Sequence, residues 1–386
     1  MKSYPIAAPD IGDLEARYVL EAIESGWISS IGKYVTKFEE GFAEFCGGAH
    51  GVSMTNGTDA LRIALRTMGI GAGDEVIVPA LSFIAVQAAV VDSGATPVMV
   101  DVDEDFWCLN PKLVAEAIGP KTKAIIAVHS YGHPADMDGL REAVGDRKIH
   151  ILEDAAESHG AKYKGKMVGS LADAACFSFY GNKLLTTGEG GIILTDNANL
   201  AERARFLRDH AMDKNRRYFH PEVGFNCRLT NVQAAIGCAQ IERSEELIGG
   251  KNRLLDLYKR RFADFSFIKL NPAATWAQPV NWLTCAVLEP QFADLRDPLC
   301  AALKEKGVDT RPFFVPAYEM PPYAEYKVIH YADSLEDTVS SRISKRGFNL
   351  PTLIGMSEDD VAYIAEAVSS SFEAVADDAT HSRSSR

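Results

Sequence analysis

One lysine of this chain, Lys183, stands where a side chain could act as an amine nucleophile. An apolar strand is expected over 174–178, and a glycine-rich turn over 186–191 follows the lysine closely. A lysine between a strand end and a tight turn can be partly removed from water, which lowers its pKa and leaves more free amine. The alternative is an ordinary solvated lysine before a plain loop, which is the more frequent environment of a lysine.

Two carboxylates follow an earlier strand, which the pattern predicts over 150–152. Asp154 and Glu157 lie in the run Glu-Asp-Ala-Ala-Glu-Ser-His-Gly at 153–160. Ligands of open α/β sheets bind at the carboxyl ends of the strands, so these side chains occupy a functional position. Asp154 there could accept a hydrogen bond from a cationic ring nitrogen. The alternative is that Asp154 or Ser158 caps the following turn.

A third segment, Thr-Asn-Gly-Thr-Asp-Ala at 55–60, places Gly57 and the hydroxyl of Thr58 where a helix begins. Backbone N–H groups without partners and the helix dipole make such a position a seat for a phosphate. The alternative is a plain helix start with Thr58 as the capping residue.

Arginines gather in a fourth segment. Arg216 and Arg217 precede Tyr218, and Asn226 follows within the same polar stretch. This is the clearest basic cluster in an acidic chain, and its guanidinium groups could clamp a diphosphate. The alternative is a solvated charged loop.

The elements that must position these residues alternate between helix and strand. Short apolar strands are predicted over 75–78, 97–100, 124–128, 150–152, 174–178 and 191–195, with amphipathic helices over 58–68, 83–91, 110–118 and 138–144. Nearly all-apolar strands separated by helices indicate a mainly parallel sheet that is buried on both faces. The fold class expected is therefore α/β.

The rest of the chain divides by composition. A long helical stretch is expected from Asn231 to about Phe262, interrupted near the glycine pair 249–250. We expect an α/β domain with an N-terminal helical segment over 1–245, a smaller α+β domain over 246–375, and a disordered polar tail over 376–386.

Charge and cysteine content exclude several functions. The 386 residues carry a formal net charge of −13, which disfavours general binding to nucleic acid or to anionic membranes. No apolar run is long enough for a transmembrane helix. The 7 cysteines are dispersed and form no Cys-x-x-Cys pair, which predicts reduced thiols in a cytoplasmic protein and no metal site.

Together the four segments resemble the DegT/StrS-type sugar aminotransferases, over about residues 4–375. The block Phe-Ser-Phe-Tyr-Gly-Asn-Lys at 177–183 with its Thr-Thr-Gly-Glu-Gly-Gly continuation is the most specific part. The runs 26–30, 215–218 and 320–323 most resemble the GDP-perosamine synthases within that family. The resemblance implies the aspartate-aminotransferase fold (PLP fold type I) and pyridoxal 5'-phosphate (PLP) as cofactor.

The resemblance also implies residue roles. Lys183 would bond covalently to the cofactor, and Asp154 would pair with its pyridinium nitrogen. The cofactor would further contact Gly57, Thr58, Phe83, Glu157, Ser178 and, from a second subunit of a homodimer, Asn226. The nucleotide-sugar would contact Arg216, Arg217, Tyr218 and Tyr318.

The implied reaction moves an amino group from glutamate to C4 of GDP-4-keto-6-deoxymannose, with lipopolysaccharide O-antigen or a secondary metabolite as the destination. One loop departs from the perosamine pattern, because Val315 and Tyr318 stand where His or Tyr, then His, are usual. Three alternatives stay open: another nucleotide-keto-sugar carrying dTDP or UDP, an aminocyclitol precursor, or a PLP-binding regulator without turnover.

Overall fold

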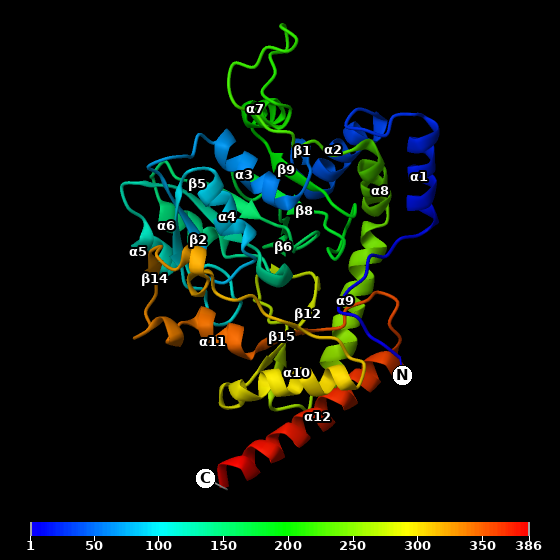
Figure 1. Ribbon diagram of the computed structural model, residues 1–386, viewed down its shortest axis with the longest axis vertical. Coiled ribbons are helices and arrows are strands. Elements are labelled where there is room, and N and C mark those ends of the chain that lie inside the picture. The colour runs from blue at the N-terminus through cyan, green and yellow to red at the C-terminus, as the bar shows by residue number, and fades with distance from the viewer. Residues whose placement is uncertain (1, 385–386) are drawn as a thin grey trace.

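A large mixed sheet forms the centre of the computed structural model, which describes residues 2–384 (Figure 1). The eight strands lie in the order β1-β9-β8-β5-β4-β2-β3-β14, and all neighbours from β8 to β14 are parallel. β9 is antiparallel to both of its neighbours, β1 and β8, and so runs opposite to the other strands of this sheet. The strands are β1 (His50–Met54), β2 (Glu75–Pro79), β3 (Thr96–Val100), β4 (Thr122–Val128), β5 (His150–Asp154), β8 (Ala174–Ser178), β9 (Gly191–Thr195) and β14 (Val328–Ile329).

Helices cover both faces of this sheet, and successive strand residues point to opposite faces. In β4, Ile125 packs in one apolar cluster with α2, α5, α6 and α8, while Ile126 packs in the other with α3, α4 and α7. α1 packs on α8 at the edge of the molecule. These helices are α1 (Asp13–Glu24), α2 (Lys33–Cys46), α3 (Gly57–Thr67), α4 (Ala85–Asp92), α5 (Pro111–Ala117), α6 (Met137–Val144), α7 (Ala198–Arg208) and α8 (Asn231–Glu242).

A second, antiparallel sheet with four strands in the order β10-β12-β15-β13 lies below the first in Figure 1. Its strands are β10 (Ile268–Leu270), β12 (Thr284–Leu288), β13 (Arg311–Pro312) and β15 (Gly347–Leu350). Its helices are α9 (Ser244–Arg261), α10 (Arg296–Glu305), α11 (Val339–Arg346) and α12 (Glu358–Ser384). A small sheet joins β11 (Ala277–Gln278), β6 (Lys162–Tyr163) and β7 (Lys166–Met167). Short 3₁₀ turns are η1 (Ser130–Gly132), η2 (Pro290–Leu295), η3 (Ala317–Glu319), η4 (Pro321–Tyr323) and η5 (Leu335–Asp337).

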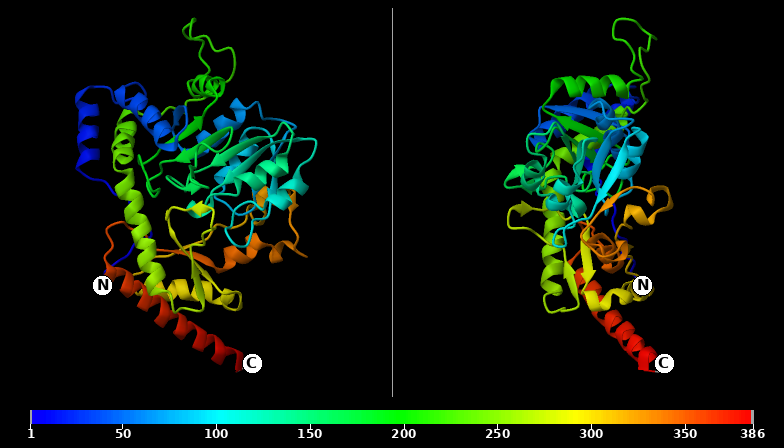
Figure 2. Two further views of the ribbon diagram at one scale, coloured as in Figure 1. Left: turned by 180° about the vertical axis from the view of Figure 1, so that it is seen from behind. Right: turned by 90° about the vertical axis from the view of Figure 1, so that its left-hand side faces the viewer.

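The N-terminal segment belongs to the core beside this second sheet. Tyr4 pairs with Val308 in a parallel bridge, and its ring stacks on Tyr363 of α12 with 5.6 Å between ring centres. The N-terminus and the start of α12 accordingly lie together in Figure 1 and in the reverse view of Figure 2. The sequence placed this segment with the first 245 residues, and the structure packs it against the C-terminal part.

Two further details differ from the sequence-based expectation. The long helical stretch breaks at Arg243, whose guanidinium binds Asp10, Glu15 and Glu246, and not at the glycine pair 249–250. Gly250 lies inside α9, where a Cβ would come within 2.6 Å of Ile354. Its role is thus close packing and not a helix break.

The predicted disordered tail is also corrected for residues 376–384. α12 continues through Ser384, and within it the Thr380 hydroxyl donates to the Ala376 carbonyl at 2.9 Å. Such bonds to the carbonyl one turn back keep polar side chains compatible with a helix. Residues 385–386 lie outside the described part of the chain.

The segment between α7 and α8, residues 209–230, stands out from the body in all three ribbon views (Figures 1 and 2). Within residues 2–384 no helix is both long and apolar enough to cross a membrane.

Candidate active site

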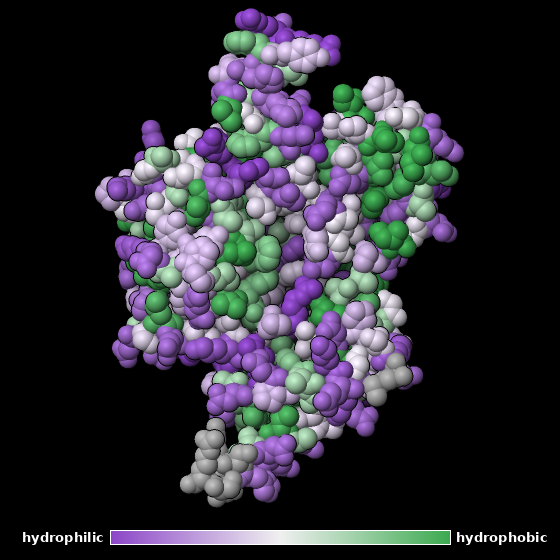
Figure 3. Space-filling model, viewed as in Figure 1, coloured by the Kyte–Doolittle hydropathy of each residue, from purple (hydrophilic) through white to green (hydrophobic). Residues whose placement is uncertain are grey.

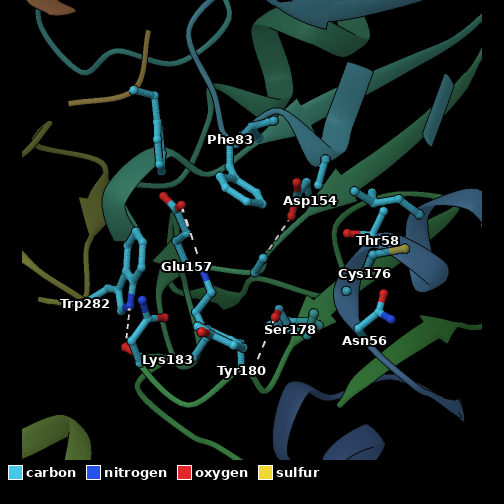
Figure 4. A pocket seen from close by; sticks show the side chains of 18 of the residues that line it. Asn56, Thr58, Phe83, Asp154, Glu157, Cys176, Ser178, Tyr180, Lys183 and Trp282 are labelled. Atoms are coloured by element: carbon cyan, nitrogen blue, oxygen red, sulfur yellow. Dashed lines mark hydrogen bonds and ion pairs between the residues drawn. The ribbon is translucent and has the colours of Figure 1, made fainter. Parts of the chain in front are cut away.

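A cavity of about 500 Å³ opens where the parallel strands β4, β5 and β8 end. Val128, Asp154 and Ser178 are the last residues of these strands, and all three line it. Seven of the lining residues are ones predicted from the sequence: Gly57, Thr58, Phe83, Asp154, Glu157, Ser178 and Lys183. Figure 4 shows Phe83, Asp154, Glu157 and Lys183 around one space. The cavity lies at the carboxyl edge of the sheet, as expected for an α/β fold.

Lys183 reaches this cavity from the turn after β8, and its side chain is only 11% exposed. Its Nζ atom lies 3.8 Å from Glu157 Oε1 and 3.9 Å from the centre of the Trp282 ring (Figure 4). Burial lowers the pKa of Lys183, and the charges of Glu157 and Asp154 oppose that shift. The amine is therefore more available as a nucleophile than a solvated lysine.

Asp154 is buried at the end of β5, where the parallel register sets it beside Val128 and Cys176. One carboxylate oxygen accepts a hydrogen bond from the Ala156 N–H at 3.1 Å. Burial raises the pKa of Asp154, against the effects of that hydrogen bond and of the charge on Lys183. A cationic partner in the cavity would stabilise its ionised form.

Glu157 is the second buried carboxyl group of the cavity. Its Oε2 atom accepts a hydrogen bond from the Tyr131 N–H at 2.7 Å, and Tyr131 holds the unusual φ of 51° that aims this group. Burial raises the pKa of Glu157 to about 7, while the charge of Lys183 counteracts the shift. Glu157 can thus change its protonation near neutral pH.

An anion seat is built at the start of α3. The side chain of Asn56 accepts from the Asp59 N–H at 2.8 Å, so Asn56, and not Thr58, is the capping residue. The first N–H groups of the helix, at Gly57 and Thr58, have no partner within a helix and line the cavity. A Cβ on Gly57 would come within 2.8 Å of Ser178 Cβ, so the backbone lies directly against this serine. A phosphate fits such a position.

Four predicted residues lie on the projecting segment and do not line the cavity of their own chain. Arg216, Arg217 and Asn226 are exposed, and Tyr218 is 75% exposed. The guanidinium of Arg216 lies over the ring of the neighbouring Phe219 at 4.4 Å from its centre.

Tyr318, which was predicted to contact the sugar, does not line the cavity. It is buried, and its hydroxyl group lies 2.5 Å from Thr338 Oγ1 and 3.2 Å from the Leu335 carbonyl oxygen. Its hydrogen-bonding capacity is used inside the protein.

Several lining residues were missed by the sequence analysis: Asn56, Tyr180, Asn182, Trp282, Arg311 and Phe314. Three of them lie in blocks that were already singled out around Gly57 and Lys183. The other three come from the C-terminal part of the chain, where no local pattern marked them. The indole N–H of Trp282 donates to the Asn182 carbonyl at 2.9 Å and thereby fixes the ring beside Lys183.

A buried lysine, a buried carboxylate and an anion seat at the carboxyl edge of this sheet define a PLP-type aminotransferase site. The model of the DegT/DnrJ/EryC1/StrS aminotransferase family matches residues 9–369. The chain belongs to this family.

Sequence similarity to known relatives extends over nearly the whole chain. The GDP-perosamine synthase of Caulobacter vibrioides is 43% identical over 364 residues, covering 94% of this chain and 96% of the relative. The GDP-perosamine synthase of Escherichia coli O157:H7 is 38% identical over 368 residues, covering 95% and 98%. A sugar-aminotransferase candidate from Streptococcus pneumoniae, solved in its PMP-form, superposes with a TM-score of 0.91 at 26% identity, covering 98% of this chain and 100% of that structure.

The same Streptococcus protein has also been solved in a PLP-form. The predicted family, α/β fold, aminotransferase activity and PLP cofactor are therefore confirmed.

Proposed function

We propose that this aminotransferase transfers the amino group of glutamate to C4 of a GDP-linked 4-keto-6-deoxy sugar, GDP-4-keto-6-deoxymannose, and so makes GDP-perosamine. The observation that carries the chemistry is the buried amine of Lys183 in one cavity with the buried carboxylate of Asp154. The similarity to two GDP-perosamine synthases supports the sugar.

The residues present fit PLP. The seat at Gly57 and Thr58, with the Ser178 hydroxyl, would hold the phosphate, and Phe83 would lie against the ring. Glu157 would lie near the ring hydroxyl. Its carboxyl group changes protonation near neutral pH, so it could donate or accept a hydrogen bond there. When bound, PLP supplies a ring that draws electrons from the carbon bearing the transferred amine.

Two residues would carry the proton movements. Asp154 would hold a proton on the ring nitrogen of the bound cofactor, which would maintain its electron-withdrawing character. The amine of Lys183 would hold the cofactor and serve as the base that moves a proton beside the transferred amine. A keto-sugar would run the same steps in reverse.

A homodimer would complete the site. Leu20, Ile23, Trp27, Ile28 and Ile31 on α1 and the turn after it are each more than half exposed. Figure 3 shows the resulting apolar patch on the upper right of the molecule. Contiguous apolar surface of this kind is typical of a protein interface. The segment 209–230 projects from the body (Figure 2), and we propose that its basic residues meet the nucleotide diphosphate in the cavity of the other subunit.

The proposal extends to the cell compartment and the pathway. All seven cysteines are unpaired, which fits a reducing cytoplasm. Perosamine made there would serve O-antigen synthesis.

Mass spectrometry of the products tests the proposal. The purified enzyme is incubated with PLP, glutamate and, in parallel, GDP-, dTDP- and UDP-linked 4-keto-6-deoxy sugars. We expect an amino sugar from the GDP substrate. Amination of only a dTDP or UDP substrate would overturn the perosamine assignment, and no amination of any sugar would favour an aminocyclitol precursor or a regulator.

A further inference from the structure

Lys251 is a second buried lysine, and the proposed chemistry does not use it. It lies on α9 and is only 3% exposed. Within residues 2–384 its amine forms no ion pair, and its hydrogen-bond partners are two backbone carbonyl groups. Burial lowers the pKa of Lys251 to about 8, and the charge of Asp10 opposes that shift. A buried amine is costly unless its hydrogen bonds are made, so its position depends on these two carbonyl groups.

The two carbonyl groups belong to segments that flank two strands of the second sheet. The Nζ atom of Lys251 donates to the Trp282 carbonyl at 3.4 Å and to the Thr352 carbonyl. Trp282 precedes β12, and Thr352 follows β15. The hydroxyl of Thr352 also accepts from the Thr284 N–H at 2.8 Å. Lys251 therefore joins α9 to the segment before β12 and to the segment after β15.

The residue before Trp282 is bound to the same turn of α9. The side chain of Asn281 donates to the Lys251 carbonyl at 3.0 Å, and its backbone N–H donates to the Asn252 side chain at 3.1 Å. Asn281 and Trp282 are both buried. Together with the bond from Lys251 to the Trp282 carbonyl, these contacts hold the segment on α9.

This segment carries the ring that faces the active lysine. The indole N–H of Trp282 donates to the Asn182 carbonyl at 2.9 Å, and the ring centre lies 3.9 Å from Nζ of Lys183 (Figure 4). Trp282 is thus held at both ends, by Asn182 at the indole N–H and by Lys251 at the backbone. A cation–π contact depends on where the ring lies, so a shift of this backbone would weaken it.

We propose that Lys251 is a positioning residue, which holds the Trp282 ring against the amine of Lys183 and thereby favours the protonated form of that amine. This assignment rests on the proposed role of Lys183 as the residue that bonds to the cofactor. It adds a residue outside the cavity that sets the state of the reacting group. A supporting shell of this kind keeps a functional side chain in its productive geometry.

The sign of the effect separates this role from a direct effect of charge. The charges that act on the pKa of Lys183 are those of Glu157, Asp154 and Arg311. Loss of the Lys251 charge alone would raise the pKa of Lys183, because a nearby cation disfavours a second one. Loss of the contact with the indole ring would instead lower that pKa.

The test measures the pH midpoint for attachment of added PLP, followed by absorbance. We expect Lys251→Met to lower the midpoint by about half a unit, and Lys251→Arg, which keeps the charge and the N–H donors, to shift it less. In the Trp282→Leu background, Lys251→Met should cause no further decrease, because the ring through which it acts is absent.

Two variants on the same helix serve as controls. Leu254→Ala removes a buried side chain from the apolar core beside the second sheet, and Lys259→Met removes an exposed charge. Leu254→Ala should lower the urea midpoint of unfolding but leave the midpoint for PLP attachment unchanged. Lys259→Met should change neither. Loss of stability is thereby distinguished from loss of the ring position.

A second readout needs no cofactor. Competitive labelling of the cofactor-free protein with acetic anhydride at several pH values, read by mass spectrometry, reports the pKa of Lys183 itself. This pKa should fall in Lys251→Met and stay unchanged in Leu254→Ala. If Lys251→Met does not fold, Lys251→Gln, which keeps an amide donor, replaces it and should give a smaller shift in the same direction.

Three results would overturn the proposal: an unchanged pKa of Lys183, a raised one, or an equal decrease with and without the Trp282 ring. The proposed site is checked by the wild type in the same experiment. Attachment of PLP to a different lysine would refute the role of Lys183 and this assignment together. Attachment to Lys183 with one midpoint in all variants would refute the role of Lys251 alone.

Discussion

The Nζ atom of Lys183 lies 3.9 Å from the centre of the Trp282 indole ring. The two residues are nearly one hundred positions apart, and Trp282 precedes β12 of the second sheet. A cation over an aromatic face is stabilised by about 0.5–2 kcal/mol, depending on its exposure to water. Trp282 thus favours the protonated form of a lysine whose burial favours the neutral one.

Removing this ring should therefore lower the pKa of Lys183 further. In Trp282→Leu we expect the pH midpoint for attachment of added PLP to fall by up to about one unit, measured by absorbance. Trp282→Phe keeps a ring and should shift the midpoint less. An upward shift in Trp282→Leu would contradict this account.

Lys183 should carry the cofactor. Borohydride reduction of the PLP-loaded enzyme followed by peptide mapping should place the pyridoxyl group on Lys183. Lys183→Ala should fold but lose transamination, whereas Lys269→Ala, an exposed lysine on β10, should keep it. A label on another lysine would remove the basis of the site assignment.

Asp154→Asn should retain the fold and lose most turnover. The amide cannot keep the ring nitrogen protonated, and loss of a buried charged partner costs about 3–5 kcal/mol, which corresponds to a decrease in kcat of a hundredfold or more. Asp138→Asn, an exposed carboxylate on α6, is the control for steady-state kinetics. A near-normal kcat in Asp154→Asn would show that Asp154 acts only as a turn cap.

Glu157 should make the stability of the cofactor-free protein depend on pH. Its pKa is raised from 4.5 to about 7, so the folded chain retains a proton that the unfolded chain releases between these values. The stability it contributes is present below about pH 4.5 and is lost as pH rises through 7.

The variant Glu157→Gln stays neutral throughout. The difference in unfolding free energy between the variant and the wild type should therefore rise in favour of the variant by up to about 3 kcal/mol between pH 4.5 and 8. Urea unfolding at several pH values measures this, with the exposed Glu24→Gln as control. A difference independent of pH would show that burial does not hold the proton on Glu157.

The proposed dimer makes a prediction about shared sites. Lys183→Ala and an Asn226→Ala/Arg217→Ala double variant should each be inactive. Mixed and allowed to exchange subunits, they should regain activity, because a heterodimer contains one site with all its residues intact. Exchange verified by mass spectrometry without regained activity would place Asn226 and Arg217 outside the partner's site.

The predicted residues that line the cavity share a physical reason for their position. Gly57, Asp154, Ser178 and Lys183 each lie next to the end of a strand or the start of a helix, so their position follows from local pattern plus the rule that parallel strands end at one edge. The parallel strands themselves are predictable because they are short, apolar and separated by helices.

The residues missed depend on packing between distant segments. Arg311 and Trp282 enter the cavity because the second sheet docks against the first, and no local pattern encodes that docking. Tyr318 is the opposite case, because it was predicted for the site and does not line the cavity. Its hydroxyl suggested a ligand contact, but Thr338 and the Leu335 carbonyl, which arrive through tertiary structure, satisfy it.

The bridge between Tyr4 and Val308 constrains how the molecule folds. The partners of Tyr4, at 307–309 and 363, follow it by about three hundred residues in the sequence, so the segment around Tyr4 can dock only after they have been synthesised. Tyr4 shares one apolar core with β10, β12, β15 and α12. We therefore expect the unfolding of the second sheet to release the segment around Tyr4 and α12 together.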